Sequence, residues 1–263
     1  METTKSVDGT VIAYDRTGAG PPLLVAVGAL CDRRSFVPPE ALTSAFTVYT
    51  YDRRGRGDSG DTPPYSPDLE VADLAAVASA ASAASLAWSE TYAYGHSSGG
   101  ALVLRAAASG VPLTAVAAYE APFVVPGTRE VAQNPADRIR ELVAAGRRGD
   151  AVRYWMTSVV DAPPQVLPMM EASPWWPGLE ALAHTLPYDL ALTGDQGIPA
   201  WLSSIVAPAL VLGGGTSVDW FHRTVAETAA AIPGARLVMV EGYDHQIPPE
   251  VIAPVLTEFF LGG

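Results

Sequence analysis

Short apolar runs alternate with helix-like segments along this 263-residue chain, and this alternation restricts the possible folds more than any other feature. Strand-like apolar runs occupy residues 23–27, 47–51, 92–94, 113–119, 209–212 and 236–240, after a first hairpin that turns at 8–9. Helical composition marks residues 68–86, 101–108, 218–232 and 251–260. Apolar strands separated by helices predict an α/β fold with a mostly parallel sheet and helices on both faces.

One long segment, residues 124–204, interrupts the alternation because it contains no convincing strand. It holds four of the six tryptophans and three of the five methionines, and prolines recur along it. We interpret it as a helical insertion that forms a lid over an apolar pocket, between two parts of one core domain, 1–123 and 205–263. Additional core packing is the alternative. The candidate substrate-binding residues are Trp155, Met170, Trp175, Trp176 and Tyr188.

Charge and cysteine content exclude several classes of protein. The formal net charge of −12 argues against binding to nucleic acid or to an acidic membrane surface, because both require clustered Lys and Arg. The single cysteine, Cys31, allows no internal disulfide. No pair of His or Cys has metal-ligand spacing, and the first residues lack an apolar signal segment. We therefore expect a cytoplasmic protein without metal or cofactor that acts on a small molecule.

The pattern Gly-x-Ser-x-Gly occurs at residues 95–99, between a strand-like run and a helix-like run. In that setting it is typical of a nucleophile elbow, a strained turn that exposes a serine hydroxyl and needs small neighbours. Ser97 is the central serine and the expected nucleophile. Ser98 begins the helix, so its backbone N–H is expected to stabilise the negatively charged oxygen of a reacting carbonyl.

A serine needs a general base, and the chain has four histidines. His96 lies inside the elbow, where its side chain is expected to point away from Ser97. His184 falls in the insertion and His222 lies early on a helix. His245 follows the last expected strand, at the sheet edge where the elbow also lies, so we predict that His245 is the base.

Five stretches of the chain, "LLVAVGAL", "YDRRGRGDS", "YGHSSGG", "PALVLGGG" and "EGYDH", resemble the α/β-hydrolase superfamily, and the likeness extends over nearly the whole sequence. The resemblance implies an eight-stranded, mostly parallel sheet with a helical lid, and a serine–acid–histidine order along the chain. Many relatives have His-Gly before the oxyanion residue, where this chain has Val27-Gly28. By position in the family, Ala29 supplies the second oxyanion N–H. A backbone donor does not depend on the side chain before it.

The acid of the triad is less evident. The family acid usually follows the strand matched here by "PALVL", but no carboxylate stands at the expected place after the glycines, and Asp219 comes late. Glu120 ends an apolar run just before Pro122, at the same sheet edge. Fungal zearalenone lactonases resemble this chain in placing a glutamate there. Glu120 is our preferred acid, Asp219 and the lack of any acid being the alternatives.

These observations predict a serine hydrolase that cleaves an ester or lactone of a hydrophobic small molecule through an acyl-enzyme. Two other outcomes fit the same fold: a non-hydrolytic enzyme, such as a lyase or cofactor-free peroxidase, and a ligand-binding protein without catalysis. Residues 55–60 also match Gly-x-Gly-x-x-Gly, but no helix-like segment follows directly, so a dinucleotide site is not expected.

Overall fold

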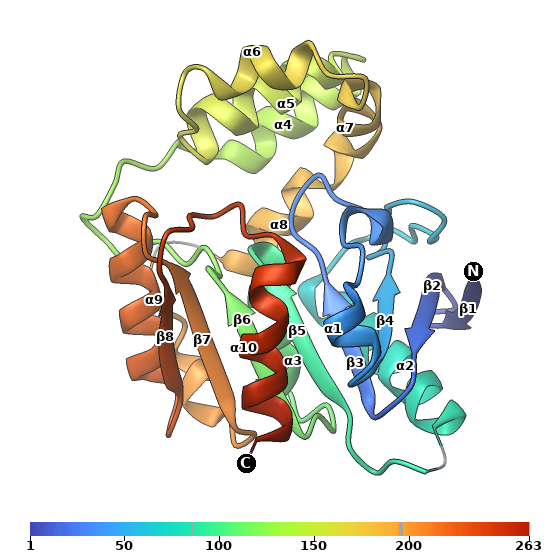
Figure 1. Ribbon diagram of the computed structural model, residues 1–263. Helices are drawn as coiled ribbons and strands as arrows, with labels where there is room; N and C mark the ends of the chain where they lie inside the picture. The colour runs from blue at the N-terminus through green and yellow to red at the C-terminus, as the bar shows by residue number, and fades with distance from the viewer. Residues whose placement is uncertain (86, 195–196, 263) are drawn as a thin grey trace.

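An eight-stranded sheet forms the centre of the computed structural model, which describes residues 1–85, 87–194 and 197–262 (Figure 1). The strand order is β1-β2-β4-β3-β5-β6-β7-β8. Strand β2 runs antiparallel to both of its neighbours, and the remaining pairs are parallel. The strands are β1 (Glu2–Lys5), β2 (Val11–Gly18), β3 (Pro22–Ala26), β4 (Thr47–Tyr51), β5 (Tyr92–His96), β6 (Ala115–Tyr119), β7 (Ala209–Gly214) and β8 (Arg236–Val240).

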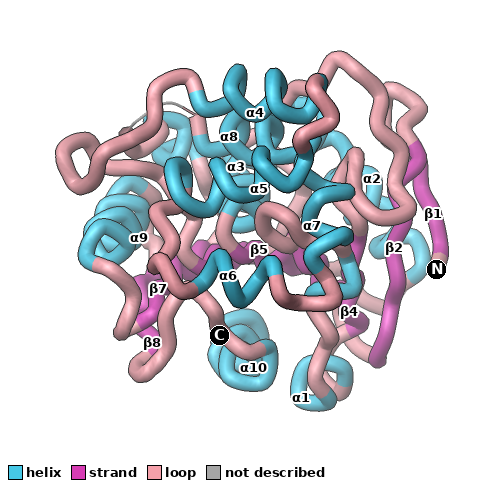
Figure 2. The backbone as a smooth tube through the Cα atoms, turned by 90° about the horizontal axis from the view of Figure 1, so that it is seen from above, coloured by secondary structure: helices cyan, strands magenta, loops and turns pink. Residues whose placement is uncertain are grey.

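Helices cover both faces of the sheet. Figure 2 shows α1 and α10 on one side, and α2, α3 and α9 on the other. The α-helices are α1 (Glu40–Thr43), α2 (Pro67–Ala84), α3 (Ser98–Ala108), α4 (Pro135–Ala144), α5 (Arg148–Tyr154), α6 (Val166–Glu171), α7 (Trp176–Leu182), α8 (Leu186–Thr193), α9 (Asp219–Ala231) and α10 (Pro249–Leu261). Short 3₁₀ helices lie at η1 (Arg33–Ser35), η3 (Ala183–Thr185) and η4 (Ala200–Ser204), and η2 (Trp155–Val159) is a π-helix.

Burial on both faces of the sheet explains why the central strands are continuous apolar runs. Every residue of β3, β6 and β7 is buried. One apolar core joins the sheet to α2 and α3, through residues such as Leu74 and Leu102. A second joins the opposite face to α1 and α10, through residues such as Leu42 and Leu256. The expected hairpin, parallel strands and flanking helices are all present; the helix expected over 68–86 ends at Ala84, and residue 86 lies outside the described residues.

The segment between β6 and β7 contains no strand in the residues described there, 120–194 and 197–208. Figure 1 shows α4, α5, α6 and α7 stacked above the edge of the sheet where the parallel strands end. These helices share a small apolar core of their own, which includes Ile139, Leu142 and Trp155 and also reaches Leu30. The last part of the segment differs, because Leu192 of α8 and Leu202 of η4 belong to the main core beside α3.

Candidate active site

The turn from β5 to α3 has the form of a nucleophile elbow. Ser97 lies between the two elements with φ 56° and ψ −127°, a conformation that L-residues adopt only under strain. A Cβ on Gly95 would come within 2.2 Å of the Gly99 carbonyl oxygen, and a Cβ on Gly99 within 2.1 Å of the Ala26 carbonyl oxygen. Only glycine therefore allows the strand and helix to approach this closely.

Three non-glycine residues with positive φ lie in the loops at this sheet edge. Leu30 (56°) follows β3, Ser97 (56°) follows β5 and Glu120 (45°) follows β6. Because parallel strands end at one edge, these loops converge there. Backbone strain of this kind costs about 1–3 kcal/mol for each residue and is concentrated at functional sites.

Glu120 and His245 form a direct pair. His245 Nδ1 lies 2.7 Å from Glu120 Oε2, although 125 residues separate them in sequence. The Glu120 side chain is fully buried, and its Oε1 accepts hydrogen bonds from the Gly214 N–H (2.9 Å) and the Ser217 hydroxyl (2.5 Å). Burial raises the pKa of Glu120, but the hydrogen bonds from His245, Ser217 and Gly214 outweigh it, so the pKa is lowered. The carboxylate is therefore charged at neutral pH.

Asp219, the alternative acid, occupies a different position. It is the exposed first residue of α9, and no hydrogen bond or ion pair joins it to His245 within the described residues. The loop after β7 instead contributes Gly214 and Ser217, which bind Glu120. The loop that follows the glycines 213–215 therefore hydrogen-bonds the carboxylate of Glu120, which comes from the end of the neighbouring strand β6.

Aromatic rings hold the His245 imidazole. The ring of Phe221 stacks on it with ring centroids 4.9 Å apart. The centroid of the His96 ring lies 4.8 Å from that of His245, and the two ring planes are tilted by 42°. His96 Nε2 donates to the His245 carbonyl oxygen at 2.8 Å. Burial, followed by the nearby His245, lowers the pKa of His96 to about 4, so His96 is neutral at pH 7. The contact between these two histidines was not expected from the sequence, because nothing in the elbow pattern indicates it.

The two backbone N–H groups predicted to form an oxyanion hole belong to residues in the turn at Ser97 and in a loop beside it. Ser98 is the first residue of α3, and Ala29 follows Gly28 in the loop after β3. A Cβ on Gly28 would lie 3.0 Å from the Ser97 Cβ, so this loop is adjacent to Ser97. Neither the Ala29 N–H nor the Ser98 N–H donates a hydrogen bond to any protein atom in the described part of the chain. Both donors are therefore free to bind a ligand.

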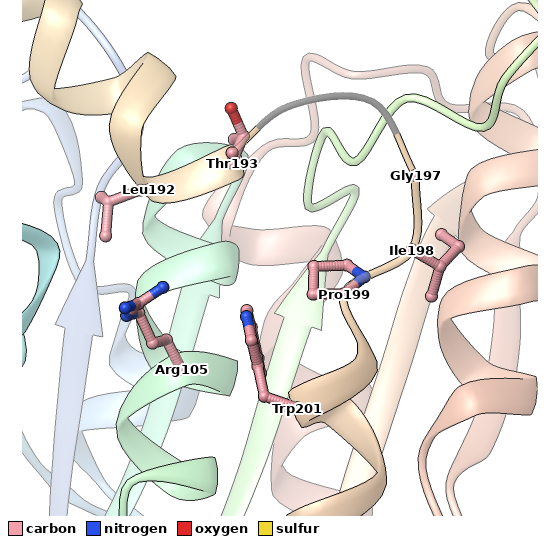
Figure 3. A pocket seen from close by; sticks show the side chains of 8 residues that line it. Arg105, Leu192, Thr193, Gly197, Ile198, Pro199 and Trp201 are labelled. Atoms are coloured by element: carbon pink, nitrogen blue, oxygen red, sulfur yellow. The ribbon is translucent and has the colours of Figure 1, made fainter.

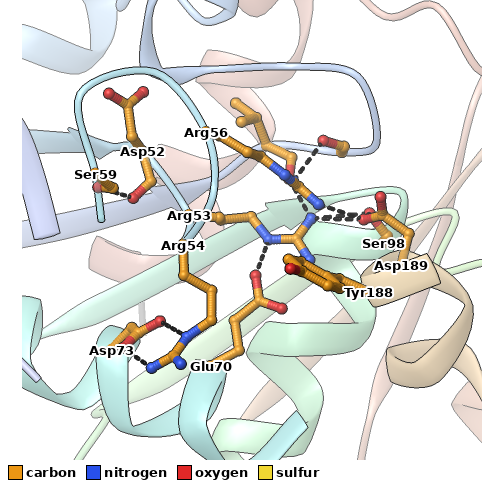
Figure 4. Close-up of polar contacts among 12 residues, drawn as sticks. Asp52, Arg53, Arg54, Arg56, Ser59, Glu70, Asp73, Ser98, Tyr188 and Asp189 are labelled. Carbon is orange, nitrogen blue, oxygen red and sulfur yellow. Dashed lines mark hydrogen bonds and ion pairs between the residues drawn. The ribbon is translucent and has the colours of Figure 1, made fainter. Parts of the chain in front are cut away.

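The Ser98 side chain has a second role that the motif did not reveal. Its hydroxyl donates to Asp189 Oδ1 (2.7 Å) and lies 3.0 Å from Arg53 Nη1, and it is buried. Arg53, Arg54 and Arg56, from the loop after β4, are also buried and pair with acidic groups (Figure 4). Three arginines in "DRRGRGDS" were the available signal, but their acidic partners lie 17 to 136 residues away and follow no local pattern.

The five candidate substrate-binding residues do not gather in one place. Trp155 is buried in the small core of the insertion, whereas Trp175 is 53% exposed. Trp176 packs against that core and lies under the guanidinium of Arg153, and Met170 is half-buried on α6. Tyr188 stacks on Tyr65 with ring centroids 4.0 Å apart and hydrogen-bonds Asp61. Substrate contact by these residues stays a prediction.

A cavity of about 210 Å³ lies away from these groups (Figure 3). It is lined by residues of α3, the end of α8 and η4, among them Arg105, Leu192 and Trp201. Neither Ser97, Glu120 nor His245 lines it. It is therefore not the space in which an ester would meet the candidate nucleophile.

No cluster of three potential metal ligands exists among residues 1–85, 87–194 and 197–262. Burial raises the pKa of the Cys31 thiol, which disfavours the reactive thiolate. In the same described residues, no helix is both long and apolar enough to cross a bilayer.

Comparison with known proteins identifies the family. The model of the alpha/beta hydrolase family matches residues 23–253, most of the chain. This chain belongs to the alpha/beta hydrolase family. The expected fold, with its eight-stranded and mostly parallel sheet, is thereby confirmed. No curated protein matched the sequence.

Solved structures of other hydrolases share this fold. An alpha/beta hydrolase from Sphaerobacter thermophilus is 48% identical, with a TM-score of 0.91 over 98% of this chain and 100% of its own. An esterase from Thermogutta terrifontis is 20% identical, with a TM-score of 0.72 over 98% and 96%. An enol-lactonase from Burkholderia xenovorans is 24% identical, with a TM-score of 0.66 over 97% and 96%. The likeness to the last two is evidence for the fold alone.

Proposed function

We propose that this member of the alpha/beta hydrolase family is a serine hydrolase that cleaves an ester or lactone. The observation that carries the proposal is the 2.7 Å contact between His245 Nδ1 and the buried Glu120 carboxylate, at the sheet edge where the half-buried Ser97 lies on a strained turn. A charged acid, an imidazole bound to it and a serine hydroxyl are the three parts of a nucleophilic triad.

The reaction begins when the Ser97 hydroxyl attacks the substrate carbonyl carbon. His245 Nε2 takes the hydroxyl proton, because Nδ1 keeps its own proton in the hydrogen bond to Glu120. The Glu120 charge stabilises the imidazolium that forms. His245 then gives the proton to the leaving alcohol, which leaves an acyl group on Ser97.

The tetrahedral intermediate carries a negative oxygen, and two free N–H groups are available to bind it. We assign this role to the backbone of Ala29 and Ser98, next to Ser97. Removal of one such donor lowers the rate by about 10²–10³ in enzymes of this kind. In the second half of the reaction His245 removes a proton from water, which attacks the acyl group and releases the acid.

The substrate class follows less directly. The insertion carries exposed and half-buried apolar side chains above the sheet edge, with Met170, Trp175 and Trp176 among them, which supports a hydrophobic substrate. An esterase and an enol-lactonase share this fold, so the fold is compatible with cleavage of an ester or of a lactone.

The test is a panel of p-nitrophenyl esters of increasing chain length together with lactones of five to fourteen ring atoms. We expect turnover of at least one member by the wild-type chain and no turnover by Ser97→Ala, whose unfolding midpoint should equal that of wild type. Substrates that bind without being cleaved would indicate a ligand-binding protein. Turnover retained by Ser97→Ala would point to a non-hydrolytic or serine-independent reaction and would contradict the proposal.

A further inference from the structure

A buried cluster of charges joins the insertion to the core, where Asp189 meets arginines of the loop after β4 and Ser98 (Figure 4). Asp189, on α8, is 1% exposed, and its Oδ1 accepts from Arg56 Nη2 (2.8 Å), Arg53 Nη1 (3.0 Å) and the Ser98 hydroxyl (2.7 Å). Arg53 also pairs with Glu70 of α2. Two cations and two carboxylates thus neutralise one another without water access, so each depends on the others.

The same arginines hold the loop that carries Ala29. Arg53 Nη1 donates to the Val27 carbonyl oxygen (3.2 Å), and Arg56 Nη1 donates to the Gly28 carbonyl oxygen (3.1 Å). In a planar trans peptide the C=O and the following N–H point in opposite directions. Because the Gly28 carbonyl faces Arg56, the Ala29 N–H faces away from the cluster. The guanidinium therefore sets the direction of this donor.

The other oxyanion donor is connected to the same carboxylate. Ser98 supplies the N–H through its backbone, and its hydroxyl is fixed by Asp189. Asp189 is therefore connected to both donors. It reaches the Gly28–Ala29 peptide through Arg56, and it contacts Ser98 directly. Burial raises the pKa of Asp189, but Arg56 and Arg53 outweigh it and lower the pKa, so the group is an anion at neutral pH.

We propose that Asp189 is a positioning residue that aligns both N–H donors of the oxyanion hole, so that seating of α8 on the core completes the catalytic geometry. This inference rests on the proposed function. Asp189 touches neither the substrate nor the reacting atoms. It acts through Arg56 and Ser98, and it belongs to the insertion rather than to the sheet or its loops.

The experiment compares Asp189→Asn with Asp73→Asn. Asp73 is equally buried and pairs with Arg54 of the same arginine-rich loop, but it does not reach Val27, Gly28 or Ser98. Both variants are measured on the best ester from the substrate panel, and unfolding midpoints are recorded. Each variant is also titrated with a trifluoromethyl ketone, which forms a tetrahedral adduct with an oxyanion, and with the matching methyl ketone, which resembles the ground state.

We expect Asp189→Asn to lower kcat by about 10- to 100-fold with less than about a threefold change in KM. Its affinity for the trifluoromethyl ketone should fall by a similar factor, while its affinity for the methyl ketone stays the same. Asp73→Asn should lose stability but keep kcat and both affinities within about twofold. Equal losses of kcat in the two variants, or a folded Asp189→Asn with wild-type kcat, would overturn the inference.

A second variant covers the case in which Asp189→Asn does not fold. Arg56→Lys keeps the charge beside Asp189 but lacks the planar fork that reaches both Asp189 and the Gly28 carbonyl. We expect the same selective loss of kcat and trifluoromethyl ketone affinity, and an unchanged value for either refutes the inference. If the wild-type chain cleaves no ester and is not inhibited by the fluorinated ketone, the proposed function itself fails.

Discussion

Glu120 combines three properties, each of which costs free energy of folding. It is fully buried, it is charged, and its backbone has a positive φ of 45°. Three hydrogen-bond donors, from His245, Ser217 and Gly214, offset the loss of water around its carboxylate. We infer that this arrangement serves to hold a negative charge beside the His245 imidazole.

A substitution at Glu120 tests the acid directly. Glu120→Gln keeps the shape but places a neutral amide against His245 Nδ1, which disturbs the imidazole tautomer and removes the charge that stabilises the imidazolium. We expect kcat to fall by about 10²-fold or more. Asp219→Asn should change kcat by less than about threefold, because this side chain is exposed at the start of α9. Steady-state kinetics of both variants, after circular dichroism confirms folding, provide the comparison; the reverse pattern would assign the acid to Asp219.

His96 gives a prediction for stability against pH. Its folded pKa of about 4 lies below the ordinary value of 6.5, so between these values the unfolded chain binds more protons than the folded one. The stabilisation is complete above pH 6.5 and is lost as pH falls toward 4. We expect the free energy of unfolding of wild type to fall by about 1–3 kcal/mol more than that of His96→Gln over this range. Urea unfolding at several pH values measures it, and parallel curves for the two proteins would contradict the assignment.

At the scale of elements, the sequence predicted the order of strands and helices well, because buried parallel strands produce apolar runs that are easily distinguished from helices. It could not predict the contacts between loops. The pairs Glu120–His245 and Arg56–Asp189 join residues 125 and 133 positions apart. Topology brings the first pair to one edge, which is why the strand-end argument for Glu120 anticipated the contact. No comparable argument existed for Asp189, which lies within the insertion.

The tryptophans of the insertion differ in burial, and that difference predicts different effects. Trp155 fills the small core under α4 and α5 and is 8% exposed, so Trp155→Ala should lower the free energy of unfolding by about 3–5 kcal/mol. Trp175 is 53% exposed, so Trp175→Ala should change it by less than about 0.5 kcal/mol.

Kinetics separate packing from substrate contact at these two positions. Trp175→Ala should raise KM for the best ester without a matching change in kcat, if this side chain covers the bound substrate. Chemical denaturation and steady-state kinetics on the same samples provide both quantities. An unchanged KM in Trp175→Ala would remove this residue from the predicted substrate-binding set.

At the scale of the whole molecule, five loops from five parallel strands bring together the parts of a single candidate site. The loop after β4 provides the arginines, and those after β3, β5, β6 and β8 provide Ala29, Ser97, Glu120 and His245. The insertion adds Asp189 from above the same edge. Motifs pointed to the candidate catalytic groups, whereas the buried ion pairs of the arginines depend on the folded arrangement and follow no periodic pattern in the sequence.

The central claim is that Ser97 is a nucleophile activated by His245, and covalent labelling tests it most directly. A fluorophosphonate should add once to the wild-type chain, and peptide mass spectrometry should place the phosphonate on Ser97 rather than on Ser98. Ser97→Ala should remain unmodified, and His245→Gln should react at least about 10²-fold more slowly. A wild-type protein that stays unlabelled, or that carries the phosphonate on another residue, would contradict the account.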